Sequence, residues 1–91
     1  MTDAPDPWSD FVRELGMRIF RARSEQHLSQ EQVAHAAGLA TFTYRKLEKG
    51  ESNPGTSANP RLRTIVAVSE VLGVPLPDLI PTPPKGLPPE R

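Results

Sequence analysis

Side chains that can donate hydrogen bonds to an anion gather between residues 41 and 49. Arg45, Lys46 and Lys49 follow one another closely, and the hydroxyls of Thr41 and Thr43 precede them. Larger apolar residues interrupt this run at an interval of three, which predicts a helix with one apolar and one cationic face. Taken alone, a cationic face is typical of solvated surface, but on a suitable scaffold it can bind a polyanion.

The two histidines do not form a catalytic or metal site. His27 and His35 are eight residues apart, and the chain contains no cysteine. Neither histidine has a serine or a carboxylate pair beside it with an orienting partner, as nucleophilic or acid–base catalysis requires. We therefore expect no enzymatic activity, no metal site and no cofactor.

Composition predicts one small domain with a basic middle. The 91 residues carry 11 basic and 11 acidic side chains. From Arg13 to Arg63, however, the sequence contains nine Lys or Arg and five acidic residues, a local net charge of +4. No apolar run is long enough to span a membrane, and the acidic, proline-broken amino terminus is unlike a signal peptide. We expect a cytoplasmic protein without a membrane partner.

Residues 30–49 have the spacing of two short helices joined by a sharp turn. Gly38 stands where the helical period breaks, and glycine adopts the left-handed conformation of such turns without strain. Ala34 faces the second helix, where a larger side chain would push the helices apart. Ser29 and Gln32 form the sequence pattern of a capping box, which predicts the start of the first helix.

The remaining chain predicts three further helices in an all-α, five-helix fold. Residues 10–26 carry an apolar stripe made by Phe11, Leu15, Ile19 and Ala22. Asn59-Pro60 is typical of a helix start, and Leu62, Ile65, Val68 and Leu72 would then face inward. Residues 74–80 suggest a short last helix. The domain would thus span residues 10–80, between a flexible arm over 1–9 and a proline-rich, disordered tail over 81–91.

Several separated motifs make the chain resemble a known family. They are Arg23 before Leu28-Ser29-Gln30, the pair Ala34 and Gly38, Leu47-Glu48-Lys49-Gly50, Asn53-Pro54, and Leu72-Gly73-Val74 before Leu79. In this order, over roughly residues 10 to 80, they resemble the Cro and phage-repressor type of helix-turn-helix domain, the xenobiotic-response-element (XRE) family of bacterial regulators. The resemblance implies a lambda-repressor-like fold that binds double-stranded DNA and regulates transcription.

The resemblance also implies roles for individual residues. With the helix over residues 41–49 in the major groove, the side chains expected to contact bases are Thr41, Phe42, Arg45 and Lys46. The alternative for Phe42 is that it folds back onto the helix pair as core. The side chains expected to contact phosphates are Gln30, Thr43, Lys49, Ser52, Arg61 and Arg63. Arg23 and Glu48 are expected to form a partly buried ion pair, a structural role shared with Ala34 and Gly38.

Two positions depart from the family pattern. Ala40 stands where relatives often carry Ser or Thr, so either Thr41 caps the 41–49 helix and it starts one residue later, or the cap is missing. Residues 51–60 form a longer connection than expected, either a tolerated surface insertion or an added arm that touches DNA.

The resemblance leaves a choice of partners. One recognition helix reads few bases, so we expect a homodimer on a two-fold site, with Leu76, Leu79 and the end of the fourth helix as its contact surface. The competing interpretation is a protein-interaction module, such as an antitoxin or a bridging coactivator, in which the same fold binds a protein partner.

Overall fold

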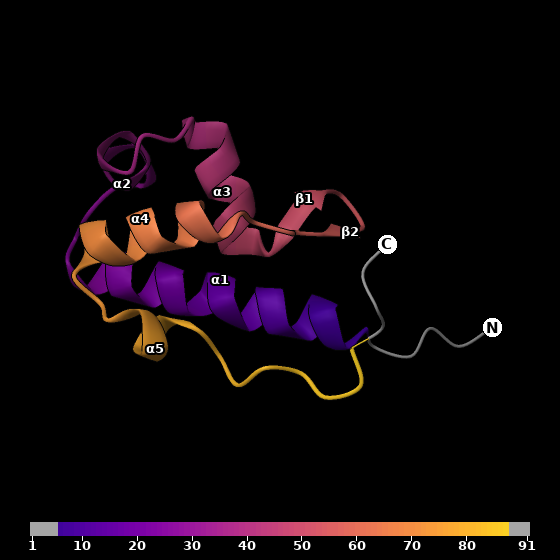
Figure 1. Cartoon of the computed structure of the whole chain (residues 1–91). Coiled ribbons are helices and arrows are strands. Elements are labelled where there is room, and N and C mark those ends of the chain that lie inside the picture. The colour runs from indigo at the N-terminus through magenta and orange to yellow at the C-terminus, as the bar shows by residue number, and fades with distance from the viewer. Residues whose placement is uncertain (1–5, 88–91) are drawn as a thin grey trace.

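The computed structural model describes residues 6–87, and five helices and one small hairpin make up this part of the chain (Figure 1). The elements are α1 (Pro7–Glu25), α2 (Gln30–Ala36), α3 (Thr41–Lys49), β1 (Glu51–Asn53), β2 (Thr56–Ser57), α4 (Leu62–Leu72) and α5 (Leu76–Leu79). In the view of Figure 1, α4 lies along α1, with α2 and α3 on one side of this pair and α5 on the other. The five-helix fold expected from the sequence is confirmed, with a hairpin added.

The helix-turn-helix segment forms as its sequence predicts. Ser29 Oγ accepts a hydrogen bond from the Gln32 backbone N–H at 3.0 Å, and Gln32 Oε1 accepts one from the Ser29 N–H at 2.7 Å. Gly38 has a φ of +75°, which lets the chain reverse between α2 and α3. Ala34 is fully buried, so its small side chain permits the close crossing of the two helices.

One aliphatic core lies between α1, α4 and the helix pair α2–α3. Its buried members include Leu15, Ile19, Val33, Tyr44, Leu47, Ile65, Val68, Leu72 and Leu79. Val12 supplies the first buried residue of α1, whereas Phe11 is only half-buried and stacks beside Trp8 with ring centroids 5.3 Å apart. The stripe expected to start at Phe11 is therefore rotated toward Val12.

Helix α1 begins at Pro7, three residues before the expected start at Asp10. Asp6 caps it, because the Asp6 carboxylate accepts a hydrogen bond from the Trp8 backbone N–H at 3.2 Å, and Pro7 occupies the first turn. Residues 7–9 of the expected arm thus belong to the helix, and residues 1–5 lie outside the described part. Trp8 Nε1 also donates to the Ala58 carbonyl at 2.7 Å, which ties the start of α1 to the end of the hairpin.

Helix α4 begins later than expected, and its first residue points outward. Asn59-Pro60 does not start the helix; Arg61 is the N-cap residue, without a side-chain hydrogen bond. Just before this pair, Ala58 is tied to other segments, since its N–H donates to the Gly50 carbonyl at 2.9 Å and its own carbonyl accepts from Trp8. Leu62, expected in the core, is 71% exposed.

The expected loop over residues 51–60 contains an antiparallel hairpin. Glu51 pairs with Ser57 and Asn53 with Thr56, around a Pro54-Gly55 turn in which Gly55 has a φ of +80°. Proline followed by a glycine with positive φ is the pattern of a type II turn. The longer connection is therefore a structured element.

The chain after α4 packs against α1. Helix α5 is confined to residues 76–79, shorter than the expected 74–80, and Arg18 Nη1 donates to the carbonyls of Asp78 at 3.1 Å and Ile80 at 3.3 Å. Residues 81–87 contain neither helix nor strand; Pro81 is buried, and the segment runs back along α1 in Figure 1. The rest of the expected tail, residues 88–91, lies outside the described part.

Candidate nucleic-acid interface

Helix α3 buries one side and presents the other to solvent. Tyr44 and Leu47 are buried, whereas Phe42, Arg45 and Lys49 are exposed. Phe42 keeps 67% of its surface exposed, so the alternative that it folds back as core is wrong. An aromatic ring this exposed on a cationic helix face is available to contact a partner.

The start of α3 resolves the question of its cap. Ala40 is the N-cap residue and makes no side-chain hydrogen bond, and Thr41 is the first residue of the helix. Of the two alternatives, the missing cap is therefore the one that the structure adopts. At the other end Gly50 takes a left-handed conformation with a φ of +73°, and its N–H donates to the Leu47 carbonyl at 3.1 Å. This bond terminates α3 and leads the chain into the hairpin.

Helices α1 and α3 cross so closely that a glycine is required between them. A Cβ atom on Gly16 would lie 2.7 Å from the Leu47 carbonyl oxygen and closer still to the carbonyl oxygen of Glu48. The sequence alone does not single out Gly16, because a helical glycine has no distinctive pattern of its own. The close approach fixes the distance of α3 from the rest of the fold.

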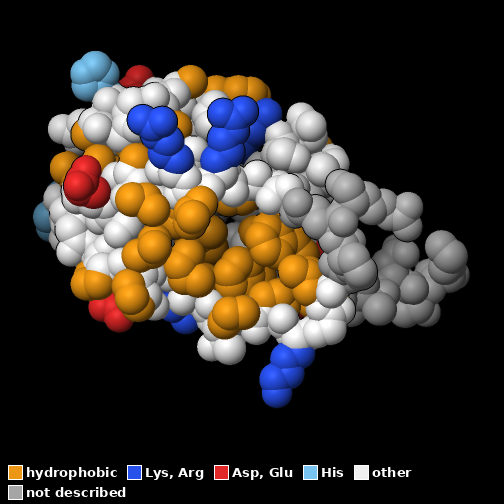
Figure 2. Space-filling model, viewed as in Figure 1, with side chains coloured by type: hydrophobic (Ala, Val, Ile, Leu, Met, Phe, Trp, Pro, Cys, Tyr) orange, Lys and Arg blue, Asp and Glu red, His pale blue; other side chains and the backbone are white. Residues whose placement is uncertain are grey.

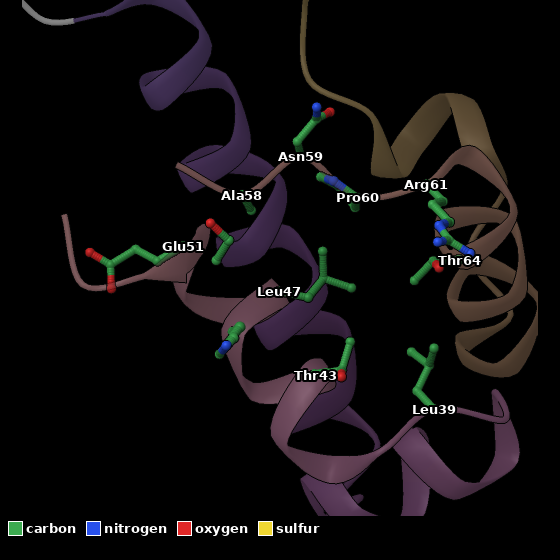
Figure 3. Close-up of a pocket in the computed structure, with 11 residues that line it drawn as sticks. Leu39, Thr43, Leu47, Glu51, Ala58, Asn59, Pro60, Arg61 and Thr64 are labelled. Carbon is green, nitrogen blue, oxygen red and sulfur yellow. The ribbon is translucent and has the colours of Figure 1, made fainter. Parts of the chain in front are cut away.

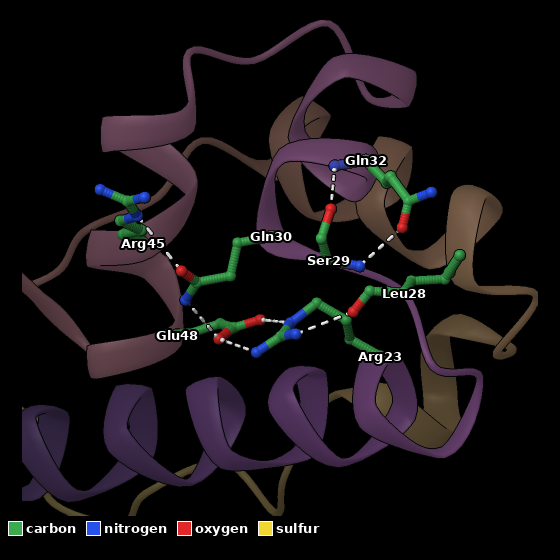
Figure 4. A network of polar contacts seen from close by, with 7 residues as sticks. All are labelled: Arg23, Leu28, Ser29, Gln30, Gln32, Arg45 and Glu48. Atoms are coloured by element: carbon green, nitrogen blue, oxygen red, sulfur yellow. Dashed lines mark hydrogen bonds and ion pairs between the residues drawn. The ribbon is translucent and has the colours of Figure 1, made fainter.

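A chain of polar contacts links the interior to the exposed face of α3 (Figure 4). Arg23 Nε donates to Glu48 Oε2 at 2.6 Å and Arg23 Nη2 to Glu48 Oε1 at 3.1 Å, so the expected ion pair forms through two hydrogen bonds. Gln30 Nε2 donates to Glu48 Oε1 at 3.0 Å, and Gln30 Oε1 accepts from Arg45 Nε at 3.2 Å. This series of contacts leads from Arg23 on α1 to Glu48 on α3, then to Gln30 on α2, and back to α3 at the exposed Arg45.

The ion pair is nearly dry. The side chains of Arg23 and Glu48 are 13% and 6% exposed, and Arg23 Nη1 also donates to the Leu28 carbonyl at 2.9 Å. Burial alone would raise the pKa of Glu48, but hydrogen bonds, chiefly from Arg23, outweigh burial and hold that pKa below its usual value. The bond to Glu48 raises the pKa of Arg23 against the opposing effect of burial. Glu48, the one acid of α3, is thus charged but turned inward.

Tyr44 lies next to this pair with its hydroxyl buried. Burial raises the pKa of Tyr44, and the Glu48 carboxylate adds to the shift. The hydroxyl has no hydrogen-bond partner among residues 6–87. The Glu48 carboxylate nevertheless lies near enough to this hydroxyl for each group to shift the pKa of the other.

The side of α3 that faces α4 forms one wall of a pocket of about 430 Å³ (Figure 3). Thr43 and Lys46 line it from α3, Ser52 from the hairpin, and Arg61 and Thr64 from the start of α4. Apolar side chains make up part of its lining. The ionic side chains around it are two cations, Lys46 and Arg61, and one acid, Glu51. The pocket therefore collects donors from three elements beside the exposed face of α3.

The cationic residues of α3 lie near one another, but two are already engaged within the protein. The Lys46 ammonium stands 4.1 Å from the centroid of the Phe42 ring, a cation–π contact between successive helical turns. Arg45 is held by Gln30. Lys49, at the carboxyl end of the helix, is exposed.

The residues expected to contact phosphates are only partly brought together. Thr43, Ser52 and Arg61 share the pocket, although Ser52 Oγ already donates to the Ser57 carbonyl at 3.4 Å. Gln30 uses its amide for Glu48 and Arg45. Arg63 is exposed on α4 and does not line the pocket.

Known proteins share the sequence pattern and the fold of this chain. A family model described as helix-turn-helix matches residues 18–79. The chain belongs to the helix-turn-helix family. Among solved structures, it is similar to the restriction-modification controller protein C.AhdI from Aeromonas hydrophila. The TM-score is 0.66 and the sequence identity 27%, over 78% of this chain and 97% of that one. None of the curated proteins that were compared matches the chain.

Membership of the helix-turn-helix family confirms the XRE-type resemblance and the lambda-repressor-like fold. It supports, in general terms, a DNA-binding transcriptional regulator. Within residues 6–87 no helix is long and apolar enough to cross a membrane, and no cluster of three metal-ligating side chains occurs.

Proposed function

We propose that this protein is a sequence-specific regulator of transcription that places α3 in the major groove of double-stranded DNA and acts without catalysis in the cytoplasm. The observation that carries the proposal is the sorting of charge on α3. Arg45 and Lys49 are exposed and Lys46 is half-buried at the pocket, whereas Glu48 is ion-paired with Arg23 on the inner side of the helix. The resulting face has only cations to offer to a polyanion.

Base recognition falls to the residues nearest the amino end of α3 and its outer face. Lys46 is the candidate donor to guanine N7 or O6, and Phe42 offers its ring to the methyl group of thymine. Thr41, at the first position of the helix, reaches a base or a phosphate. Arg45 joins this set because Gln30 already holds its guanidinium in place.

Phosphate contacts would come from the two sides of α3. Arg61, Thr43 and Ser52 approach from the pocket side, and Lys49 from the carboxyl end of the helix. Gln30 retains one amide hydrogen after bonding Glu48, and that hydrogen is its means of holding a phosphate. Arg63, the second residue of α4, does not line the pocket, and we leave it out of this set.

Selection from a random double-stranded DNA pool tests the proposal. The wild-type protein should enrich a palindromic sequence at moderate salt, and Lys46→Ala should lose about 1–3 kcal/mol, roughly 5- to 150-fold in affinity, on that sequence. Lys85→Ala, the same substitution in the segment after α5, should bind as the wild type does. Arg61→Ala should instead weaken all sequences alike and flatten the salt dependence by about one unit of slope.

The same experiment distinguishes the competing interpretation. A protein-interaction module would enrich no sequence, and its weak DNA binding would not depend on Lys46. That outcome would overturn the proposal and make a protein partner the leading assignment.

A further inference from the structure

The outward face of α4 exposes two large apolar side chains to solvent. Leu62 is 71% exposed and Val66, one turn later, is 47% exposed. Figure 2 shows hydrophobic side chains gathered in the middle of this face of the molecule, over the part of α4 and α1 that faces the viewer. Contiguous exposed apolar surface marks a site of association.

Of the surface expected for dimerisation, which is Leu76, Leu79 and the end of α4, one residue is buried. Leu79 is only 1% exposed because it belongs to the core, and Leu76 is half-buried against it. Leu79 therefore has almost no surface to offer to a second copy. The exposed apolar residues point to α4 instead.

Charges on the outward face of α4 form a self-complementary pattern. Arg63 and Glu70 are seven residues apart, or about two helical turns, so they lie on one stripe. Val66 and Ala67 lie between them, and the midpoint of the stripe falls between these two residues. Both charged side chains are exposed, and within residues 6–87 neither takes part in an ion pair. When two such helices meet antiparallel, Arg63 of each lies opposite Glu70 of the other.

We infer that this face of α4, defined by Leu62, Arg63, Val66, Ala67 and Glu70, is the interface between two copies of the chain. A two-fold contact requires one surface to complement itself, and this stripe does so in both polarity and charge. Val66 and Ala67 meet at the axis, and two Arg63–Glu70 pairs form symmetrically on either side of it. A different protein would need no such symmetry about the middle of the helix.

The antiparallel arrangement also presents both α3 helices on one side. The two-fold axis of two helices packed face to face and antiparallel lies in the interface and runs across them. An element beside one edge of α4 therefore lies beside the same edge in the second copy. Helix α3 lies across the pocket from the start of α4, on one side of that helix (Figure 3). Two recognition helices on one side are what a palindromic site requires; this last step rests on the proposed function.

Sedimentation of the full chain without DNA tests the interface through charge reversal. The wild-type protein should sediment as a dimer at about 100 μM. Arg63→Glu and Glu70→Arg should each lower the association constant at least tenfold, because each sets like charges opposite one another. An equimolar mixture of the two variants should sediment as a heterodimer, since one of its two charge pairs then joins two unchanged residues and the other joins the two substituted ones, both of opposite sign. The double variant should dimerise within about threefold of the wild type.

Further variants separate the interface from general loss of apolar surface. Val66→Lys should yield a monomer, whereas Phe20→Lys should leave the dimer intact. Phe20 is the control because it is exposed to a similar extent as Val66, at 44%, but lies on α1, where its ring contacts Arg23. Circular dichroism should show the same helix content for every variant. A wild-type monomer, or single reversals that dimerise normally, would overturn the inference. Neither result depends on DNA, so a failure of the proposed function remains distinguishable.

Discussion

Removal of Arg23 should expose how strongly the dry ion pair holds α1 against α3. Arg23→Met deletes two hydrogen bonds to Glu48 and one to the Leu28 carbonyl, and leaves the carboxylate with only the amide of Gln30. Breaking one side of a buried pair costs about 3–5 kcal/mol. Since Arg23 keeps some contact with solvent, we expect a loss near the lower end, about 3 kcal/mol at pH 7.

The pH dependence of this loss has a defined sign. In the wild-type protein the pKa of Glu48 is lowered by folding, so its contribution is present above the unfolded value of 4.5 and is lost as the pH falls through the lowered folded value. In Arg23→Met burial dominates and raises that pKa, so protonation of Glu48 favours the folded variant. The difference in the free energy of unfolding between the wild-type protein and Arg23→Met should therefore become smaller as the pH falls from 7 toward 4.

Urea unfolding followed by circular dichroism at several pH values measures both effects. The double variant Arg23→Met with Glu48→Leu is the control, because it removes the stranded charge; it should recover about half of the loss and show no narrowing. A fully stable Arg23→Met protein at pH 7, or a loss that is constant with pH, would refute this account of the pair.

Four further substitutions test the scaffold of α3. Gly16→Ala should lower the free energy of unfolding by about 2–3 kcal/mol, because the new methyl group forces α1 away from α3. Gly38→Ala should lower it by only about 1 kcal/mol, because that position has open space and only its positive φ is unfavourable for alanine. Equal urea midpoints for the two variants would contradict the close crossing. Gln30→Leu should cost about 1 kcal/mol and release the Arg45 guanidinium, seen in NMR as faster solvent exchange of the Arg45 Nε proton; unchanged exchange would mean that the contact does not hold. Tyr44→Phe should keep or raise thermal stability, because it removes a buried hydroxyl without a partner, and a marked loss would reveal a hydrogen bond there.

Local sequence signals predicted the fold best where the deciding contacts are also local. The capping box at Ser29 and the turn at Gly38 involve residues within four positions of each other, and both form as expected. The same kind of signal gave different outcomes at two aspartate- or asparagine-proline pairs. Asp6-Pro7 does start a helix, whereas Asn59-Pro60 does not; the neighbouring Ala58 is tied by hydrogen bonds to Gly50 and to the distant Trp8.

Contacts between distant segments account for what the sequence could not predict. The bond from Trp8 to Ala58 joins residues fifty positions apart, and no periodicity announces it. On α4, Ile65, Val68 and Leu72 are buried as expected, whereas Leu62, the first residue of the helix, is exposed. For the interface residues, the sequence predicted the cationic face of α3, but not that Gln30 would join the ion pair to Arg45.

The ion pair also explains how a chain without net charge can present a cationic helix. Arg23 contributes a positive charge from α1 and draws the only acid of α3 inward, so the pair cancels within the protein. Arg45, Lys46 and Lys49 then act outside without an acid on their own helix to oppose them. Because a buried pair is screened less than surface charges, this separation should persist at salt concentrations that weaken the surface field. Substitution of Arg23 should therefore lower DNA affinity as well as stability, although Arg23 itself stays behind α3.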